Sequence, residues 1–470
     1  MLLVFIRSFV MAKFNLPKYY ILALALPIFL ASLSTSITNI AVPSLMLAFD
    51  TTFTQVQWVI VAYLVTLTSA AIMTGSLADR VDLRVILLSS LSLFLFSSIL
   101  CGFSPSINWL IGYRIVQGVA AAGMMNSTMA LIAGLNAKNK AGFAMGLIGS
   151  LSAIGTATGP TLGGFLINLW GWQAIFLINI PIAAIALFLV FSLIPKNPLP
   201  KNPRKPIDFL GIFVLTITIA VYVFSLVNWG QYSYVFMVLA LIGIITFVII
   251  EKQSTHPALS ITLLKQPALL IGSTLSLLVA TVMMTTLVIG PFYLLKTLEL
   301  TPWQMGMVMS CGPIAAACLG LPAGKLVDKI GANNVIIYAL TCMVSGFTLL
   351  AYLAQHLSVA LYILFTILIT SGYAAFQAAN NKAILFDIDS SQKALLSGII
   401  NLSRNLGLIN GAALMTTLFA YAAGNTLSEK VSSQSVVNGF QLTFSVSAAL
   451  MMIAIVLILL YTYFAKRKTT

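Results

Sequence analysis

Long apolar segments, separated by short polar or charged stretches, follow one another along almost the whole chain. Most are roughly twenty residues long, the length that an α-helix needs to cross a bilayer. The pattern therefore predicts an all-α integral membrane protein. We expect fourteen transmembrane helices, at 20–42, 56–78, 85–104, 108–133, 142–168, 174–194, 207–228, 233–250, 268–292, 303–326, 334–354, 357–380, 394–422 and 439–464.

Composition agrees with a membrane setting, because 60% of the residues are hydrophobic and only 7% are charged. A soluble domain carries about 25% charged residues. The chain holds two His residues and neither an HExxH motif nor a GxxxxGK[ST] phosphate loop. We therefore expect no enzyme activity, no metal and no cofactor.

The distribution of basic residues predicts the orientation of the chain. With the N-terminus in the cytoplasm, all but four of the 24 Lys and Arg residues fall on the inner side; Lys296 and Lys430 lie outside, and Arg114 and Arg404 lie within spans. Cytoplasmic loops carry such an excess of positive charge. We expect a multi-pass protein of the cell (inner) membrane with both termini cytoplasmic. The net charge of +14 then needs no nucleic-acid partner, because topology and the lipid bilayer account for it.

An internal repeat divides the chain into two halves. The stretch "GSLADRVDLR" begins at Gly75 and "GKLVDKIGAN" begins at Gly324, an offset of 249 residues. Glycines 146, 155 and 159 match glycines 398, 407 and 411 at an offset of 252 residues. Two markers at nearly one offset indicate duplication. We expect a cytoplasmic N-terminus (1–19), a six-helix bundle (20–195), a basic linker with an inserted helix pair (196–267), a second six-helix bundle (268–464) and a cytoplasmic tail (465–470).

Several motifs resemble those of one transporter family. "GSLADRVDLR" is similar to the cytoplasmic-loop signature of the major facilitator superfamily, "RIVQGVAAAG" from Arg114 to its fourth-helix signature, and "GTATGPTLGG" from Gly155 to the fifth-helix signature of its antiporters. "LSTSITNIAVP" from Leu33 and "WVIVAYLV" from Trp58 resemble the first two helices of the fourteen-helix drug:proton antiporters (EmrB/QacA-like). The resemblance covers about residues 20–465. It implies the major facilitator fold and secondary active transport.

The fifth-helix motif holds Gly155, Gly159, Pro160, Gly163 and Gly164. Glycines four residues apart lie along one helix face and allow another helix to approach closely, and Pro160 favours a bend. Plain helix packing is one interpretation of these glycines. The resemblance implies the other, a pivot that keeps the unloaded site from leaking to the cytoplasm.

The loop motif between the second and third spans contributes Asp79, Arg80 and Arg84. A carboxylate at Asp79 can meet the positive end of a helix in the other half and latch one conformation; the alternative is a solvated turn. Asp82 and Leu83 stand where the family has glycine and arginine. The second copy contains Gly324 and Asp328 and keeps its glycine, Gly331.

Arg114 and Arg404 are candidate functional groups because charges buried in a membrane are costly. The alternative is that each pairs with backbone carbonyls or a polar neighbour. The resemblance implies that Arg114 takes part in proton coupling. All ten acidic residues lie in loops or at helix ends, and Ser34 occupies the position of the family's first-helix aspartate. Two buried arginines without a buried acid favour a neutral, zwitterionic or anionic substrate over a lipophilic cation.

We therefore expect a secondary exporter that moves small amphipathic compounds or drugs, a multidrug efflux antiporter exchanging them for protons. The remaining alternatives are a dedicated exporter of a neutral or anionic metabolite such as a siderophore, and a transport-inactive membrane sensor or scaffold. Any periplasmic adaptor protein must be a separate chain. Polar side chains expected at the substrate cavity are Ser34, Asn39, Gln117, Asn126 and Gln377.

Overall fold

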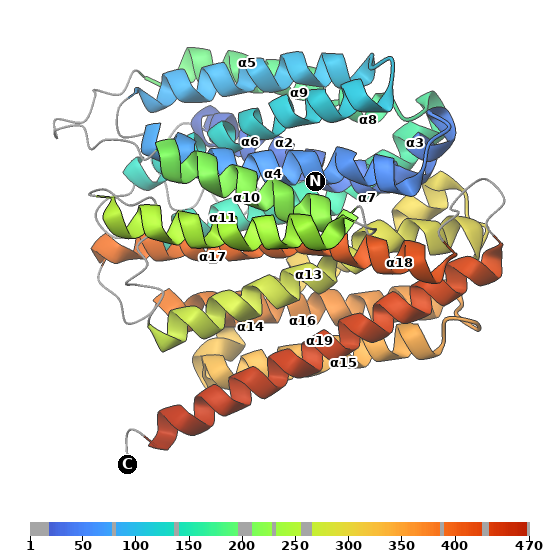
Figure 1. Ribbon diagram of the computed structural model, residues 1–470. Coiled ribbons are helices and arrows are strands. Elements are labelled where there is room, and N and C mark those ends of the chain that lie inside the picture. The colour runs from blue at the N-terminus through green and yellow to red at the C-terminus, as the bar shows by residue number, and fades with distance from the viewer. Residues whose placement is uncertain are drawn as a thin grey trace.

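The computed structural model describes residues 18–77, 81–135, 141–195, 209–227, 232–254, 266–385, 390–424 and 432–467. Across these ranges the chain is helical and forms no β-strand. Most of the long helices run nearly parallel or antiparallel to one another, as Figure 1 shows. The predicted all-α architecture is confirmed.

The first half of the chain contains the helices α2 to α9. Their bounds are α2 Lys18–Ile40, α3 Val42–Ala48, α4 Phe53–Leu77, α5 Leu83–Gly102, α6 Ile107–Leu135, α7 Ala141–Trp170, α8 Ala174–Leu177 and α9 Asn179–Leu193. The pair α10 Phe209–Val227 and α11 Ser233–Gln253 follows.

The second half contains the helices α13 to α19 and one π-helix, η2. Their bounds are α13 Pro267–Lys296, α14 Pro302–Ile330, α15 Ala332–Tyr352, α16 Val359–Leu385, α17 Ser390–Asn410, η2 Gly411–Met415, α18 Thr416–Ala422 and α19 Ser433–Arg467.

Ten described helices are long and apolar enough to cross a membrane, or eleven if the two parts of the bent helix α14 form one span. A multi-pass membrane protein is therefore confirmed, whereas the predicted number of fourteen spans is not. The apolar part of α10 is too short for this criterion, and α7 and α17 are not among the ten. Each predicted range nevertheless overlaps a helix of the structure.

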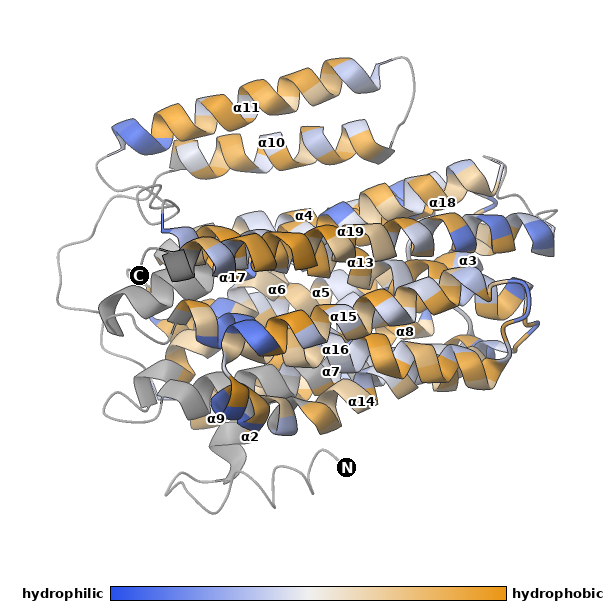
Figure 2. Ribbon diagram, turned by 90° about the horizontal axis from the view of Figure 1, so that it is seen from below, coloured by the Kyte–Doolittle hydropathy of each residue, from blue (hydrophilic) through white to orange (hydrophobic). Residues whose placement is uncertain are grey.

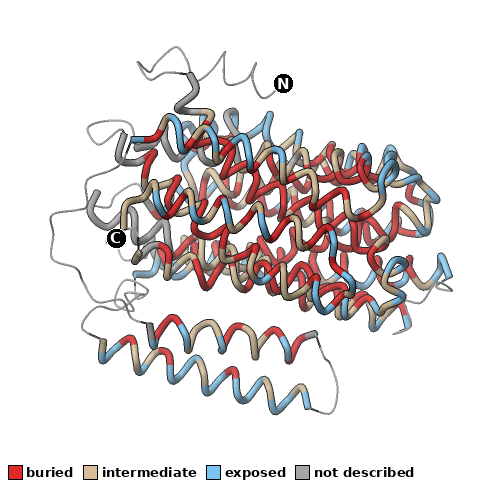
Figure 3. Tube along the Cα trace, turned by 90° about the horizontal axis from the view of Figure 1, so that it is seen from above, coloured by how far each residue is buried: buried red, intermediate tan, exposed pale blue. Residues whose placement is uncertain are grey.

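Large apolar side chains cover the outside of the bundle. They are most continuous on α11, where Leu241, Ile242, Ile244 and Ile245 are exposed, and Figures 2 and 3 show the α10–α11 pair set to one side of the other helices. Exposed apolar surface of this extent is typical of contact with lipid.

The inserted pair is fastened to the bundle through α10. Tyr222 on α10 donates a hydrogen bond to Asn410 Oδ1 at 2.7 Å, and Thr417 donates to the Leu226 carbonyl at 2.9 Å. The ring of Phe224 lies 6.0 Å from that of Trp58 on α4. Helix α10 therefore covers the line along which α4 of the first half meets α17 and α18 of the second.

Equivalent glycines of the two repeats make equivalent contacts. A Cβ atom on Gly155 or Gly159 of α7 would come within 2.7 Å of atoms of α2, and one on Gly407 or Gly411 would come within 2.3 Å of carbonyl oxygens of α13. Glycine permits this close approach because it has no Cβ. The duplication seen in the sequence thus extends to helix packing.

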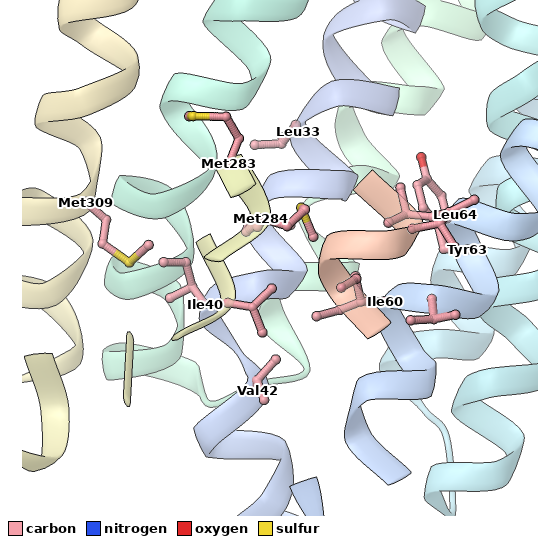
Figure 4. Packing of buried hydrophobic residues seen from close by; sticks show 14 of the residues in the cluster. Leu33, Ile40, Val42, Ile60, Tyr63, Leu64, Met283, Met284 and Met309 are labelled. Atoms are coloured by element: carbon pink, nitrogen blue, oxygen red, sulfur yellow. The ribbon is translucent and has the colours of Figure 1, made fainter. Parts of the chain in front are cut away.

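Buried apolar residues fill the space where the halves meet. Figure 4 shows Leu33 and Ile40 of α2, Ile60 of α4 and Met283 and Met284 of α13 in one cluster. All five are buried. This core therefore spans both halves of the molecule.

The two copies of the loop motif end their turns differently. Gly331 has φ +86°, a conformation that favours glycine. Asp82 in the first copy has φ −53° and caps α5, since its carboxylate accepts a hydrogen bond from the Arg84 backbone N–H at 2.9 Å. Both residues are the N-cap of the helix that follows, and the aspartate adds a side-chain hydrogen bond that glycine cannot make.

Candidate functional site

Arg114 on α6 is fully buried, with none of its surface exposed. Its Nε donates to the Val59 carbonyl at 3.1 Å, and its Nη1 donates to Ser34 Oγ at 3.0 Å and to Gln117 Oε1 at 2.6 Å. Gln117 in turn donates to Ser98 Oγ at 2.8 Å. The network therefore joins α2, α4, α5 and α6 around one cation.

An aromatic ring completes the surroundings of the Arg114 side chain. The guanidinium carbon lies 3.9 Å from the centre of the Tyr63 ring and 5.9 Å from that of Phe176. Tyr63 is held in place by a hydrogen bond from its hydroxyl to the Ala31 carbonyl at 3.1 Å. A cation over an aromatic face is stabilised by about 2 kcal/mol when it is desolvated.

The partners of Arg114 are neutral. Ser34 is one of them, and its hydroxyl offers a hydrogen-bond acceptor without a negative charge. An arginine stays protonated in proteins. The arrangement therefore keeps a positive charge inside the first half, balanced by dipoles and a π-face.

The two halves meet at one end of the bundle through three phenylalanine rings, which we call the aromatic end. Phe53 of α4 lies 5.0 Å from Phe292 of α13 and 6.1 Å from Phe419 of α18, and the last two lie 5.7 Å apart. All three rings are buried. Apolar contact thus closes this end.

Polar contacts also join the two halves. Gln57 of α4 donates from Nε2 to the carbonyls of Ala412 at 2.6 Å and Ala413 at 3.0 Å, both in η2. Thr161 of α7 hydrogen-bonds Ser310 of α14. A single extra residue in a helical turn forms a π-helix, and such turns are frequent at functional sites.

The last glycine of the fifth-helix motif makes a contact of a different kind. Gly155, Gly159 and Gly163 face α2, whereas a Cβ on Gly164 would lie 2.3 Å from the Pro302 carbonyl oxygen and 3.0 Å from Gly306 Cα of α14. Helix α7 continues through Pro160 as one element. The motif therefore packs against its own half on one face and against the other half on another.

The loop-motif residues lie apart from Arg114. Arg84 donates to the Phe191 carbonyl of α9 at 2.6 Å, within the same half. Asp328 forms an ion pair at 2.5 Å with Lys382 of α16, and the Asp328 side chain is 72% exposed. Gly324 has open space around its Cα. Asp79 and Arg80 lie outside the described residues.

The expected cavity residues take up different positions. Ser34 and Gln117 belong to the Arg114 network, and Asn126 ties α6 to α4 through the Ala71 carbonyl at 2.5 Å. Gln377 donates to Tyr373 on the same helix at 2.8 Å. Asn39 is buried, and neither its amide nitrogen nor its oxygen has a hydrogen-bond partner in the described part of the chain.

Sequence reasoning missed Gln57, Tyr63 and the π-helix. Tyr63 lies in the stretch "WVIVAYLV" that carries the family resemblance, and Gln57 is the residue directly before that stretch. A glutamine in an apolar span is itself a signal of interhelical hydrogen bonding. No group of three or more His, Cys, Asp or Glu residues that could hold a metal ion occurs in the described ranges.

A multi-pass helical bundle built from two repeated halves, with buried charge inside one half and contacts between the halves, is the architecture of a secondary transporter. The family model of the Major Facilitator Superfamily matches residues 24–412 and 275–470. The chain therefore belongs to this superfamily, which indicates a role in transport.

Curated relatives are similar over nearly the whole chain. The chain is 27% identical to the riboflavin transporter RibZ of Clostridioides difficile, over 96% of this chain and 97% of that protein. It is 28% identical to the multidrug resistance protein Stp of Mycobacterium tuberculosis, over 87% of this chain and 76% of that protein. It is 25% identical to the multidrug transporter protein MdtP of Bacillus subtilis, over 87% and 77%.

Solved structures show the same fold. A transporter of the POT family in complex with a thioalcohol-conjugated peptide superposes with a TM-score of 0.71 at 14% identity, covering 98% of both chains. The human organic anion transporter MFSD10 gives a TM-score of 0.64 at 16% identity, covering 94% of this chain and 99% of that one. The predicted superfamily fold is thus confirmed.

Proposed function

We propose that the protein is a secondary active exporter that moves small amphipathic compounds outward in exchange for protons. The observation that carries the proposal is Arg114, a buried cation fixed by three hydrogen bonds and an aromatic face inside one half of a two-half transporter fold. A charge this deep in a membrane bundle is costly and marks functional machinery by default. The multidrug transporters Stp and MdtP among the relatives support export of drug-like compounds.

We assign proton coupling to Arg114, a role that the resemblance of its helix motif supports. Because its partners are neutral, a change in the charge or hydration of its surroundings alters the balance between the two conformations of the transporter. Ser34 replaces the acid that a lipophilic cation would require, which supports a neutral, zwitterionic or anionic cargo.

A dedicated metabolite exporter is the second candidate. One observation favours it: the relative that matches the chain over 97% of its own length is a riboflavin transporter. A single planar metabolite would need no carboxylate at its site, and helices α2, α4, α6 and α13 contain none; Glu251, near the end of α11, is a buried acid on another helix, so the expectation of no buried acid does not hold. A transport-inactive sensor or scaffold has no comparable support.

The subfamily, topology and domain limits belong to the same proposal. We infer a fourteen-span, EmrB/QacA-like protein of the inner membrane with both termini in the cytoplasm, built of two six-helix bundles (20–195 and 268–464) and an inserted pair. The pair α10–α11, which lies beside the bundle, and the distribution of Lys and Arg support this arrangement. The comparisons give no support to a periplasmic adaptor, and the proposal does without one.

The fifth-helix motif and the two copies of the loop motif complete the proposed machinery. The glycines of α7 act as a pivot, supported by their close contacts with α2 and, at Gly164, with α14 of the other half. Asp79, Arg80 and Arg84 act as a gate on the cytoplasmic side, with Gly324, Asp328 and Gly331 as the second copy.

Transport by inverted membrane vesicles tests the proposal. A proton gradient is imposed, and cationic, neutral and anionic compounds are added one at a time while proton release is recorded. We expect neutral or anionic compounds to trigger proton release, and we expect Arg114→Ala to abolish this release. The control Lys296→Gln, which removes an exposed charge at the end of α13, should release protons as the wild type does. Release triggered only by lipophilic cations would contradict the cargo class, and release unchanged in Arg114→Ala would contradict its role in coupling.

A further inference from the structure

Three polar side chains on α17 have no partner in the part of the chain that the structure describes. Asn401, Arg404 and Asn405 are half-buried, and none of them forms a hydrogen bond or ion pair with a described residue. The Nε atom of Arg404 is itself buried without a partner. Burying a guanidinium N–H without a hydrogen bond is costly, so a site that keeps Arg404 needs another reason for its presence.

The contacts of α17 show which way this group lies. Gly407 and Gly411 mark the side of the helix that packs on α13, and Asn410, bonded to Tyr222, marks the side toward α10. At about 100° per residue, Arg404 lies on the α13 side, three residues before Gly407 and seven before Gly411. Asn401 and Asn405 lie farther round the helix, away from the side of Asn410. The group therefore begins at α13, and α17 also contacts α4 across the boundary between the halves.

The described helices around this group supply no negative charge. Helix α17 and the helices that it contacts, α4, α13 and α16, contain no Asp or Glu residue. Arg404 therefore lacks a carboxylate partner from any neighbouring helix. A guanidinium that stays protonated and lacks a counter-ion favours an anion at the same place.

The internal repeat shows that these three residues are not required by the packing. An offset of 252 residues aligns them with Gly149, Ser152 and Ala153 of α7. In the first half, Ser152 pairs with Ser32 of α2 at 2.8 Å and no charge is present on α7. The equivalent positions thus hold small residues in one copy, and a cation and two amides in the other.

We propose that Asn401, Arg404 and Asn405 bind an anionic group of the transported compound. Arg404 contacts the carboxylate or phosphate oxygens with its planar guanidinium, and the two asparagine amides bond the flanking polar atoms of the same compound. This inference rests on the proposed transport function and gives the cargo its chemical class, a small amphipathic organic anion. The two possible sources of charge, carboxylate and phosphate, are separated in the test.

Equilibrium binding to the purified full chain in lipid nanodiscs, without any gradient, tests this site. The probes are 2-naphthoate, its neutral counterpart 2-naphthamide and 2-naphthyl phosphate, all detected by naphthalene fluorescence after dialysis. We expect the wild type to bind at least one of the two anions about 10- to 100-fold more tightly than the amide, as a charge-assisted contact predicts. The anion that shows the preference identifies the group.

Variants of α17 then locate the preference. Arg404→Gln should abolish the preference for anions. Arg404→Lys should keep part of the preference, because lysine retains the positive charge but lacks the planar guanidinium that bonds two oxygens at once. The double variant Asn401→Ala with Asn405→Ala should weaken binding of all three probes several-fold. Asn410→Ala is the matched control, because this asparagine lies on the α10 side of the same helix. It should leave the preference unchanged.

The result that overturns the site is a wild type that binds none of the probes or shows no preference for anions, or an Arg404→Gln variant that keeps the preference. Retained binding by Arg404→Lys and Asn410→Ala shows that the helix is still folded. Failure of vesicle transport, with an anion preference that depends on Arg404, would contradict the proposed exporter and leave the binding site standing.

Discussion

Replacing Gln57 with leucine should loosen the aromatic end of the molecule. Gln57 is 2% exposed and joins α4 of the first half to η2 of the second through two hydrogen bonds. Leucine fills similar space without donating a hydrogen bond. The substitution therefore removes a polar contact between the halves and leaves the neighbouring apolar core in place.

The magnitude follows from what the two carbonyls retain. Thr416 and Thr417 also donate to the carbonyls of Ala412 and Ala413, so neither oxygen is left without a partner in the variant. The closed form then loses only the free energy of the two Gln57 hydrogen bonds, about 1 kcal/mol each and about 2 kcal/mol together. A change of this size shifts the equilibrium between the closed and open aromatic end about 30-fold toward the open form.

Thiol labelling measures that shift. In a chain without its four native cysteines, Ser310→Cys places a thiol at a residue that is 3% exposed and contacts Thr161 across the boundary between the halves. The rate of maleimide labelling reports the open population. We expect Gln57→Leu to raise the rate by about 10-fold or more, up to the 30-fold limit set by the equilibrium.

A matched control is Gln434→Leu, since Gln434 is exposed and bonds only Asn438 on its own helix. An unchanged labelling rate in Gln57→Leu, or an equal rise in the control, would refute the assignment of Gln57 to closure.

Three further predictions concern packing and charge, each measured as thermal unfolding in detergent. Gly159→Ala should destabilise the protein by about 1–3 kcal/mol, because the new Cβ would lie 2.6 Å from the Ser36 side chain. Gly112→Ala is the control and should not destabilise it, because no atom outside its own stretch of helix lies within 4 Å of the added Cβ. Equal melting temperatures of the two variants would contradict the close α2–α7 contact. Tyr63→Leu should cost about 2 kcal/mol more than Tyr63→Phe, which keeps the ring over Arg114; equal losses would show that the ring contributes little. Asp328→Asn should change stability by less than about 1 kcal/mol because the pair with Lys382 is exposed, and a larger loss would indicate a gate contact.

The repetition of apolar segments was enough to predict an all-helical membrane bundle, because the length and hydropathy of a span are local properties. The glycine faces could be predicted as well, since helical periodicity alone places Gly155 and Gly159 together. What those glycines contact depends on tertiary packing. Gly164 lies only one residue from Gly163 yet faces α14 in place of α2.

The Arg114 site was predictable as a buried charge but not as a network. Ser34, Tyr63 and Gln117 come from different helices or turns, and only the packed bundle shows that they surround one guanidinium. The π-helix was equally out of reach, because an extra residue in a turn has no simple pattern of hydropathy. Gln57 could have been suspected, since a polar amide in an apolar span seeks a partner on another helix.

The duplicated helices carry different charges in the two halves, and the roles proposed for Arg114 and Arg404 differ accordingly. Arg114 lies on α6, whose counterpart α16 has no arginine, and Arg404 lies on α17, whose counterpart α7 has no charged residue. Arg114 is surrounded by neutral partners, whereas Arg404 has no hydrogen-bond partner among the residues that the structure describes. A group that is already satisfied by its own half is suited to couple ions, and an unsatisfied group is suited to bind cargo.

The division predicts opposite phenotypes for the two arginines. Arg114→Gln should keep the preference for naphthoate or naphthyl phosphate in equilibrium binding and lose proton release in vesicles. Arg404→Gln should lose the preference in binding, and its proton release should become equally weak for charged and neutral compounds. Loss of both properties in each variant would contradict the division, because it would mean that the arginines act on one site.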